Sequence, residues 1–318
     1  MKKIILSLTL LSTLSSLNAY SAEIDSYTHR DKLFVFDASH FIDELFNQKI
    51  EAAVKEMNEI ELQCPTNEFE AEEAFDLIHE KLASPFIGHS IAQELEDTLP
   101  DRRKIYTSYE ESIYSDTTLW QGISLKLKGI LSTMKIKGNI VGVDKLGHFF
   151  VEGWGFYKRA YLEDLDQVYI DDAIDWGRFT EKTYFGMTTT GIFSHSDLIA
   201  NFNGMRFWNR IFSFKEDVLA KKKLPAYLSC KDSNWKMAKR FTIKEYVDPA
   251  WDEGINCNLY DSETIEDHVT SKIKKSFWIK DFFFDNFDFC PVNLRECKSE
   301  TEKYGKWAQG LFHPICLE

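Results

Sequence analysis

Ionisable and amide side chains gather in three short stretches near the middle of the chain. The first, VDKLGHFFVEGWGFY, places His148 and Glu152 four residues apart. The second, FTEKTYFGMTTTG, contains Glu181, and the third, FSHSDLIANFNGMRFW, contains Asp197 and Asn201. Because residues four apart share a face of an α-helix, the spacing predicts helices with narrow polar strips. Glycines interrupt the strips and favour close backbone contact, so we expect the strips to face one another across a partly buried cleft.

Paired carboxylates in such a cleft have the chemistry of glycosidic cleavage. That reaction needs one carboxylic acid kept protonated by apolar surroundings and a second carboxylate kept ionised nearby. Glu181 is the predicted proton donor, and Glu152 or Asp197 is the predicted base or nucleophile. His148 and Asn201 are expected to orient these carboxyl groups. The residues therefore predict a glycoside hydrolase.

Two other interpretations of the same residues remain open. One histidine with several carboxylates (His148, Glu152, Glu181, Asp197) suits a Mn, Fe or Zn site, although the sequence has no HExxH signature. No cofactor is therefore predicted, and a divalent metal is the alternative. The third interpretation is a buried hydrogen-bond network that fixes helix register in a non-catalytic envelope protein.

Three further residues are predicted to support the site. Asp144 and Lys145 precede His148 on the first helix, and Ser194 precedes the third. Asp144 also fits a helix N-cap, and Ser194 with Asp197 matches the S-x-x-D capping box. Both roles are compatible with a place in the site.

The N-terminus and the cysteines indicate export. Residues 1–22 contain two lysines, a short apolar run and small residues, typical of a secretory signal peptide. After its removal no membrane span is expected, because residues 139–162 carry too many charges. An even number of cysteines predicts three disulfides, with their pairing left open: Cys64, Cys230, Cys257, Cys290, Cys297 and Cys316. A net charge of −13 argues against nucleic acid as a partner. We expect a periplasmic or secreted protein whose partner is an envelope glycan such as peptidoglycan.

Apolar periodicity predicts a mainly α fold, a compact helical domain with a short β-hairpin and a disulfide-stapled C-terminal region. Helices are expected over 40–62, 68–82 and 262–275, and a strand over 241–247. The hairpin, over 132–143, is expected to turn at Gly138-Asn139.

The chain divides into a signal peptide and three regions. These are an N-terminal helical region (23–131), a motif-bearing helical core (132–215) and a Cys- and Phe-rich region (216–318). In the last region, SFWIKDFFFDNFDFC contains seven aromatic residues. They are expected either to form core around the disulfides or to stack against sugar rings.

The motifs resemble those of two bacterial envelope families. Asp144-Lys145-x-x-His148-Phe149, then Glu181, then Ser194-x-x-Asp197-Leu198-x-x-Asn201-x-x-Gly204, is similar to the pattern of the VanZ-like and YfiM-like families. The resemblance covers about 60 of 318 residues and implies an envelope location and a shared polar site, but no particular reaction. VanZ-like proteins carry these motifs on membrane helices, whereas the helices here are too polar to cross lipid.

Overall fold

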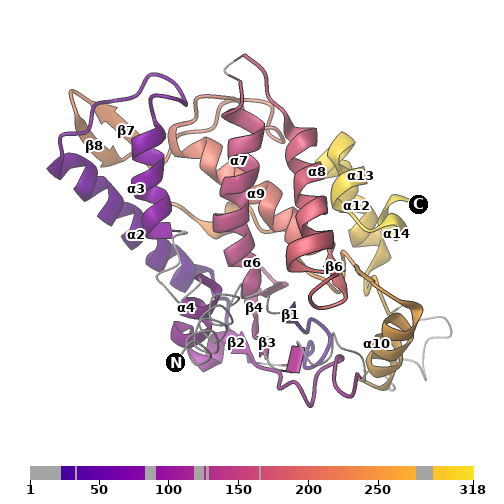
Figure 1. The fold of residues 1–318 in the computed structure, drawn as a ribbon. Helices are drawn as coiled ribbons and strands as arrows, with labels where there is room; N and C mark the ends of the chain where they lie inside the picture. The colour runs from indigo at the N-terminus through magenta and orange to yellow at the C-terminus, as the bar shows by residue number, and fades with distance from the viewer. Residues whose placement is uncertain are drawn as a thin grey trace, which may run out of the picture.

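Three helices stand side by side at the centre of the computed structural model (Figure 1): α7 (Gly153–Tyr161), α8 (Ile170–Thr180) and α9 (His195–Phe212). The structure describes residues 23–32, 34–82, 91–117, 125–126, 129–164, 166–276 and 289–318. Every residue of α9 up to Ile211 is buried, so this helix is the axis on which the others pack. The mainly helical fold predicted from the sequence is confirmed.

The N-terminal helices pack on one side of this centre (Figure 1). Helix α2 (Ser39–Glu59) buries apolar residues at intervals of three or four and packs against α3 (Glu72–Leu82). Helix α4 (Ile91–Thr98) lies nearer the small sheets. Helices were thus correctly predicted in both N-terminal segments. The second begins later than expected, because the residues just before it form turns.

The strands form small sheets around the helical centre. Strand β1 (Glu23–Ile24) pairs in parallel with β3 (Ile130–Leu131), and β2 (Lys104–Ile105), β4 (Thr133–Ile136) and β5 (Asn139–Gly142) form a three-stranded sheet. Strand β6 (Ile192–Ser194) pairs with β9 (Asn258–Tyr260), and β7 (Leu228–Lys231) with β8 (Asn234–Met237).

The predicted hairpin is present as β4 and β5, but its turn lies one residue earlier than expected. Lys137 and Gly138 are the two turn residues, with φ of 55° and 89°. Two consecutive positive φ values match the twist of the flanking strands, which explains the choice of these two positions.

Disulfides join the C-terminal third to itself and to the N-terminal helices. Cys257–Cys290 and Cys297–Cys316 lie within this third, around α10 (Glu263–Ser276), α12 (Leu294–Tyr304), α13 (Ala308–Leu311) and α14 (Pro314–Leu317). Cys64–Cys230 links the segment after α2 to β7. The helix predicted over 262–275 is confirmed as α10. Most of the Phe-rich stretch lies outside the described residues.

The strand predicted over 241–247 is wrong. Residues Ile243–Glu245 form a 3₁₀ turn, η4. Side chains of α2 take the backbone hydrogen bonds that a neighbouring strand would have used. Asn47 pairs with both backbone groups of Phe241 at 2.8 Å, and an Asp43 oxygen accepts from the Ile243 N–H at 2.7 Å. Local β propensity is thus overridden by tertiary contacts.

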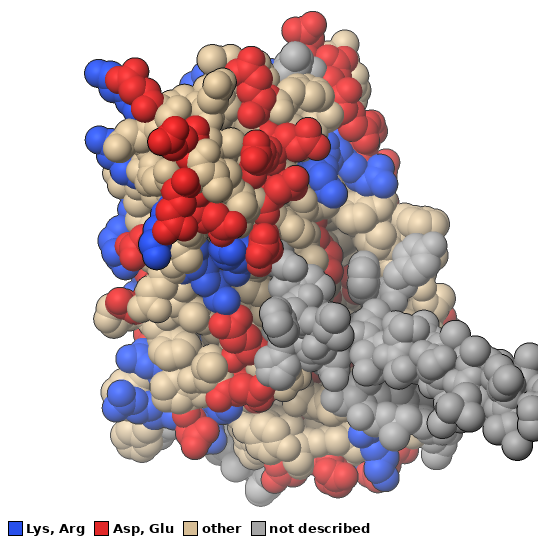
Figure 2. All heavy atoms as spheres, turned by 60° about the vertical axis from the view of Figure 1, so that its left-hand side comes forward, with Lys and Arg blue, Asp and Glu red and all other residues tan. Residues whose placement is uncertain are grey.

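The surface carries the acidic excess of the sequence. On the face in Figure 2, Asp and Glu side chains gather over the upper half, and Lys and Arg lie mainly along the left edge. Within the described part of the chain, no helix combines the length and apolar character that a bilayer span requires.

Candidate functional site

Two π-helical turns carry residues predicted for the site. After the short helix α6 (Asp144–Gly147), the turn η2 (His148–Glu152) leads into α7. A second such turn, η3 (Glu181–Phe185), continues α8. π-Helical turns inside α-helices are rare and frequently lie at functional sites. Glu181 of η3 reaches Ser194 at the start of α9, and η2 packs along α9 from Asp197 to Trp208.

Lys145 lies at the centre of the cluster and has no solvent exposure. Its Nζ contacts Asp144 Oδ2 at 2.8 Å, Asp197 Oδ1 at 2.5 Å and Glu253 Oε1 at 2.5 Å. Burial by itself would lower the pKa of Lys145, but the three carboxylates outweigh burial and raise this pKa well above 10.5. The ammonium group therefore stays charged and holds the three carboxylates together.

His148 connects the cluster to solvent. Its Nε2 lies 3.1 Å from Asp197 Oδ2 and its Nδ1 lies 3.9 Å from Glu152 Oε2. Nδ1 also hydrogen-bonds the side-chain amide of Asn201 at 3.2 Å. Burial acts to lower the pKa of His148, but Asp197 and the neighbouring glutamates outweigh it and raise the pKa well above 6.5. The side chains of His148 and Glu152 are 15% and 17% exposed, so the cluster opens to solvent here.

Ser194 caps α9 as the sequence predicted. Its Oγ accepts from the Asp197 N–H at 3.2 Å and donates to Glu253 Oε1 at 3.2 Å. In a reciprocal capping box the Asp197 side chain would accept from the Ser194 N–H. Here Glu181 Oε1 accepts from that N–H at 3.5 Å. Asp197 is therefore left to contact Lys145 and His148.

Asp144 does not cap its helix, so the predicted N-cap role is wrong. Val143 occupies the N-cap position without a side-chain hydrogen bond. Asp144 lies in the first turn and pairs with Lys145, because the buried ammonium offers a stronger partner than a backbone N–H. Its supporting role in the site stays a prediction.

The pKa values of the carboxyl groups in the cluster are shifted in different directions. Burial, reinforced by the charge of Asp197, raises the pKa of Glu181 well above 4.5. Burial also raises the pKa values of Glu152 and Asp144. Burial acts on Asp197 in the same direction, but the charges of His148 and Lys145 outweigh it and lower its pKa below 3.8. The surroundings thus favour the protonated form of Glu181 and the ionised form of Asp197.

Two glutamates of the cluster were missed by sequence analysis. Glu253 is 1% exposed, and burial raises its pKa to about 7. Its Oε2 accepts from Asn258 Nδ2 at 2.8 Å. Burial raises the pKa of Glu23 to about 8, and its Oε1 accepts from Thr190 Oγ1 at 2.6 Å. Neither lies on an amphipathic helix, so no periodic pattern pointed to them.

A subset of the cluster could hold a metal ion. Asp144, His148 and Asp197 can each offer a ligand atom within 4.8 Å of the others. Only His148 and Asp197 of this trio belong to the four metal ligands suggested by the sequence. The Lys145 ammonium contacts Asp144 Oδ2 and Asp197 Oδ1, so a positive charge already lies beside both aspartates.

The structure brings all eight predicted site residues into one cluster: Asp144, Lys145, His148, Glu152, Glu181, Ser194, Asp197 and Asn201. Comparisons with protein-family models, with curated proteins and with solved structures found no match. The resemblance to VanZ-like and YfiM-like proteins stays a prediction based on the motifs.

Proposed function

We propose that the protein is a hydrolase that cleaves glycosidic bonds in peptidoglycan or a related envelope glycan. The opposite pKa shifts of Glu181 and Asp197, which belong to one cluster, support this proposal. A glycosidase needs one carboxyl group that stays protonated and another that stays ionised, and different surroundings supply both. Glu181 would protonate the leaving oxygen. Asp197 would activate water or stabilise the developing positive charge on the sugar ring.

Asp197 suits the ionised role better than Glu152, the other predicted base. Its charge is held by contacts with Lys145 and His148, whereas burial raises the pKa of Glu152. Glu152 and His148 lie at the solvent-facing side of the cluster, where a glycan would approach. Because His148 contacts Asp197 and the Asn201 amide, it would orient the carboxylate.

Export supports an envelope substrate. Three disulfides indicate an oxidising, extracytoplasmic compartment. The predicted signal peptide agrees with this location, and we propose the periplasm or the exterior as the place of action.

A second candidate function is non-catalytic. Lys145 is fully buried and ion-paired with three carboxylates from separate segments. Such a network fixes the relative positions of α6, α9 and the loop that carries Glu253, as expected in a structural or envelope-binding protein.

Substitution of Glu181 separates the two functions. We expect the mature protein to release reducing sugar from intact sacculi, and Glu181→Gln to lower the rate by about 10²–10⁴-fold through loss of the proton donor. The melting temperature should barely change, since glutamine keeps the oxygen that accepts from Ser194 N–H. Mass spectrometry of the products measures the release.

Lys182→Gln, at the exposed neighbouring position, is the control and should keep full activity. Equal activity in Glu181→Gln would remove Glu181 from the mechanism. A wild-type protein that releases nothing from sacculi would favour the non-catalytic function.

A further inference from the structure

A cavity of about 310 Å³ adjoins the polar cluster through Asn258, which lines the cavity and donates to Glu253. Strand β9, helix α10 and the Cys257–Cys290 disulfide form its walls. Its volume is at the lower end of the range for small-molecule sites. A compact ligand of about one ring would therefore fill it.

One wall of the cavity is a polar stripe. Glu266, Thr270 and Lys274 are spaced by four along α10, so they share one face of the helix, and all three line the cavity. The stripe offers a carboxylate, a hydroxyl and an ammonium group. This mixture suits a ligand with many hydroxyl groups better than a strongly charged one.

Aromatic rings supply the apolar part of the lining. Tyr27, Tyr260 and Phe289 border the cavity, and Lys274 Nζ lies 5.2 Å from the Phe289 ring centroid. Phe289 belongs to the Phe-rich stretch for which the sequence left two roles open, core packing around the disulfides and stacking against sugars. Aromatic faces combined with a few polar groups are what a sugar ring requires, because its CH groups pack on the rings while its hydroxyls are hydrogen-bonded.

Asn258, which also lines the cavity, connects the cavity wall to the polar cluster. Its Nδ2 donates to Glu253 Oε2 at 2.8 Å, which fixes the orientation of the amide. Its Oδ1 has no hydrogen-bond partner among the described residues, although the residue is only 8% exposed. That oxygen has less than 1 Å² of accessible surface, so Asn258 fixes the cavity wall against Glu253 and does not contact a ligand itself.

We propose that this cavity binds one N-acetylated sugar ring of an envelope glycan. The Glu266 carboxylate accepts from a sugar hydroxyl, the Lys274 ammonium donates to the acetyl carbonyl oxygen, and a ring face packs on Tyr260. The choice of glycan rests on the proposed function. The binding itself requires no turnover.

Calorimetric titration of the mature, disulfide-bonded protein with tetra-N-acetylchitotetraose tests the cavity. We expect saturable binding by the wild type and about tenfold weaker binding by Glu266→Gln, which loses a charged hydrogen-bond acceptor. Tyr260→Leu should weaken binding to a similar degree by removing the aromatic face. Asp267→Asn, exposed at the next position of α10 and outside the cavity lining, is the control and should bind like the wild type.

The titration tests sugar binding in the cavity independently of the proposed hydrolysis. No saturable binding by the wild type, or equal affinity in all variants, overturns the cavity proposal. Thr270→Val provides a second test if Tyr260→Leu fails to fold. If sacculi release no product but Glu266→Gln weakens binding, the hydrolase proposal fails and the sugar site stands.

Discussion

Glu23 and Asp197 have the same exposure, 6%, yet their pKa values move in opposite directions. Burial, with the charges of Glu253 and Asp197, raises the pKa of Glu23 to about 8. For Asp197, His148 and Lys145 lie within 3.1 Å and their charges outweigh burial. Asp144 and Glu253 also contact Lys145, yet burial raises their pKa values. Asp197 differs because two cations contact it, and together they outweigh its burial.

Replacing Glu23 tests whether burial raises the pKa of this single carboxyl group in the folded protein. With a pKa of 4.5 in the unfolded chain and about 8 in the folded protein, Glu23 takes up a proton on folding between these pH values. The free energy of unfolding should therefore fall as pH rises through this window. Glu23→Gln cannot ionise and keeps the oxygen that accepts from Thr190. We expect it to melt above the wild type at pH 8 and at a similar temperature near pH 4.5.

Glu73→Gln, at an exposed position of α3, is the control for thermal unfolding at the two pH values. If the wild type and Glu23→Gln lost stability in parallel between pH 4.5 and pH 8, Glu23 would be ionised in the folded protein. Its burial would then need another explanation.

The sequence predicted the site residues that lie on helices. His148, Glu181 and Asp197 stood out because helical spacing assigns each a polar face within apolar sequence. Glu253 lies in a loop after a 3₁₀ turn, and contacts distant in sequence hold that loop in place, such as the Tyr27 hydroxyl on the Glu253 carbonyl at 3.2 Å. Local pattern carries no information about such a residue.

Close contact between backbones sets the distance from α9 to η2 and α7. A Cβ on Gly153 would lie 2.6 Å from Gly204 Cα, and a Cβ on Gly204 would lie 1.9 Å from the Phe149 carbonyl oxygen. Close backbone contact was expected at the glycines of the polar strips, and it is confirmed at Gly204. At Gly155 and Gly177 the close neighbours are instead aromatic rings, because large side chains fill the space beside small residues.

Gly204→Ala should force α9 away from η2 and α7. Since backbone atoms cannot move aside as a flexible side chain does, we expect a loss of roughly 3 kcal/mol in the free energy of unfolding, measured with denaturant. Gly147→Ala is the matched control, because its Cβ would meet only Ala92 Cβ at 3.8 Å. Alanine is the better helix former there and should stabilise by about 0.5–1 kcal/mol. Equal effects at both positions would contradict the close crossing.

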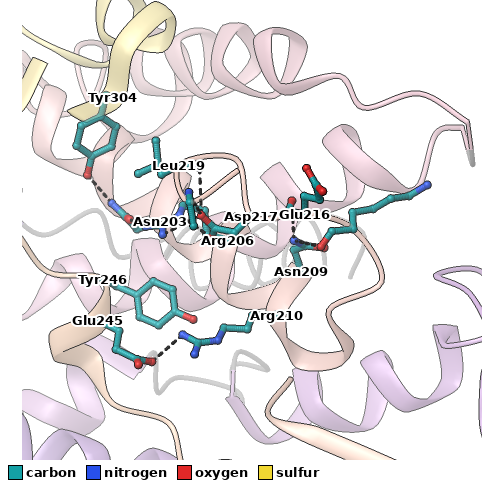
Figure 3. A network of polar contacts seen from close by, with 12 residues as sticks. Asn203, Arg206, Asn209, Arg210, Glu216, Asp217, Leu219, Glu245, Tyr246 and Tyr304 are labelled. Atoms are coloured by element: carbon teal, nitrogen blue, oxygen red, sulfur yellow. Dashed lines mark hydrogen bonds and ion pairs between the residues drawn. The ribbon is translucent and has the colours of Figure 1, made fainter. Parts of the chain in front are cut away.

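At the scale of the whole molecule, α9 joins two polar networks. Its N-terminal half contributes Asp197 and Asn201 to the candidate site. Its C-terminal half carries Arg206, whose guanidinium pairs with Asp217 at 3.0 and 3.1 Å and donates to Asn203 (Figure 3). Asn203 in turn donates to the Tyr304 hydroxyl at 2.8 Å, which ties α9 to α12. A fully buried helix can carry so many polar groups only because each network supplies partners.

The disulfides should differ in how much they stabilise this assembly. Cys64–Cys230 closes a loop with a sequence separation of 166, whereas Cys297–Cys316 spans 19. The entropy removed from the unfolded chain grows with the logarithm of loop length, so replacing both cysteines of the longer loop by alanine should cost about 2 kcal/mol more than the same change in the shorter one. Denaturant unfolding of the two double variants measures the difference. Cys297 and Cys316 are buried, so their loss also removes packing. A larger loss from that pair would mean that packing around the buried sulfurs outweighs the constraint that the long loop places on the unfolded chain.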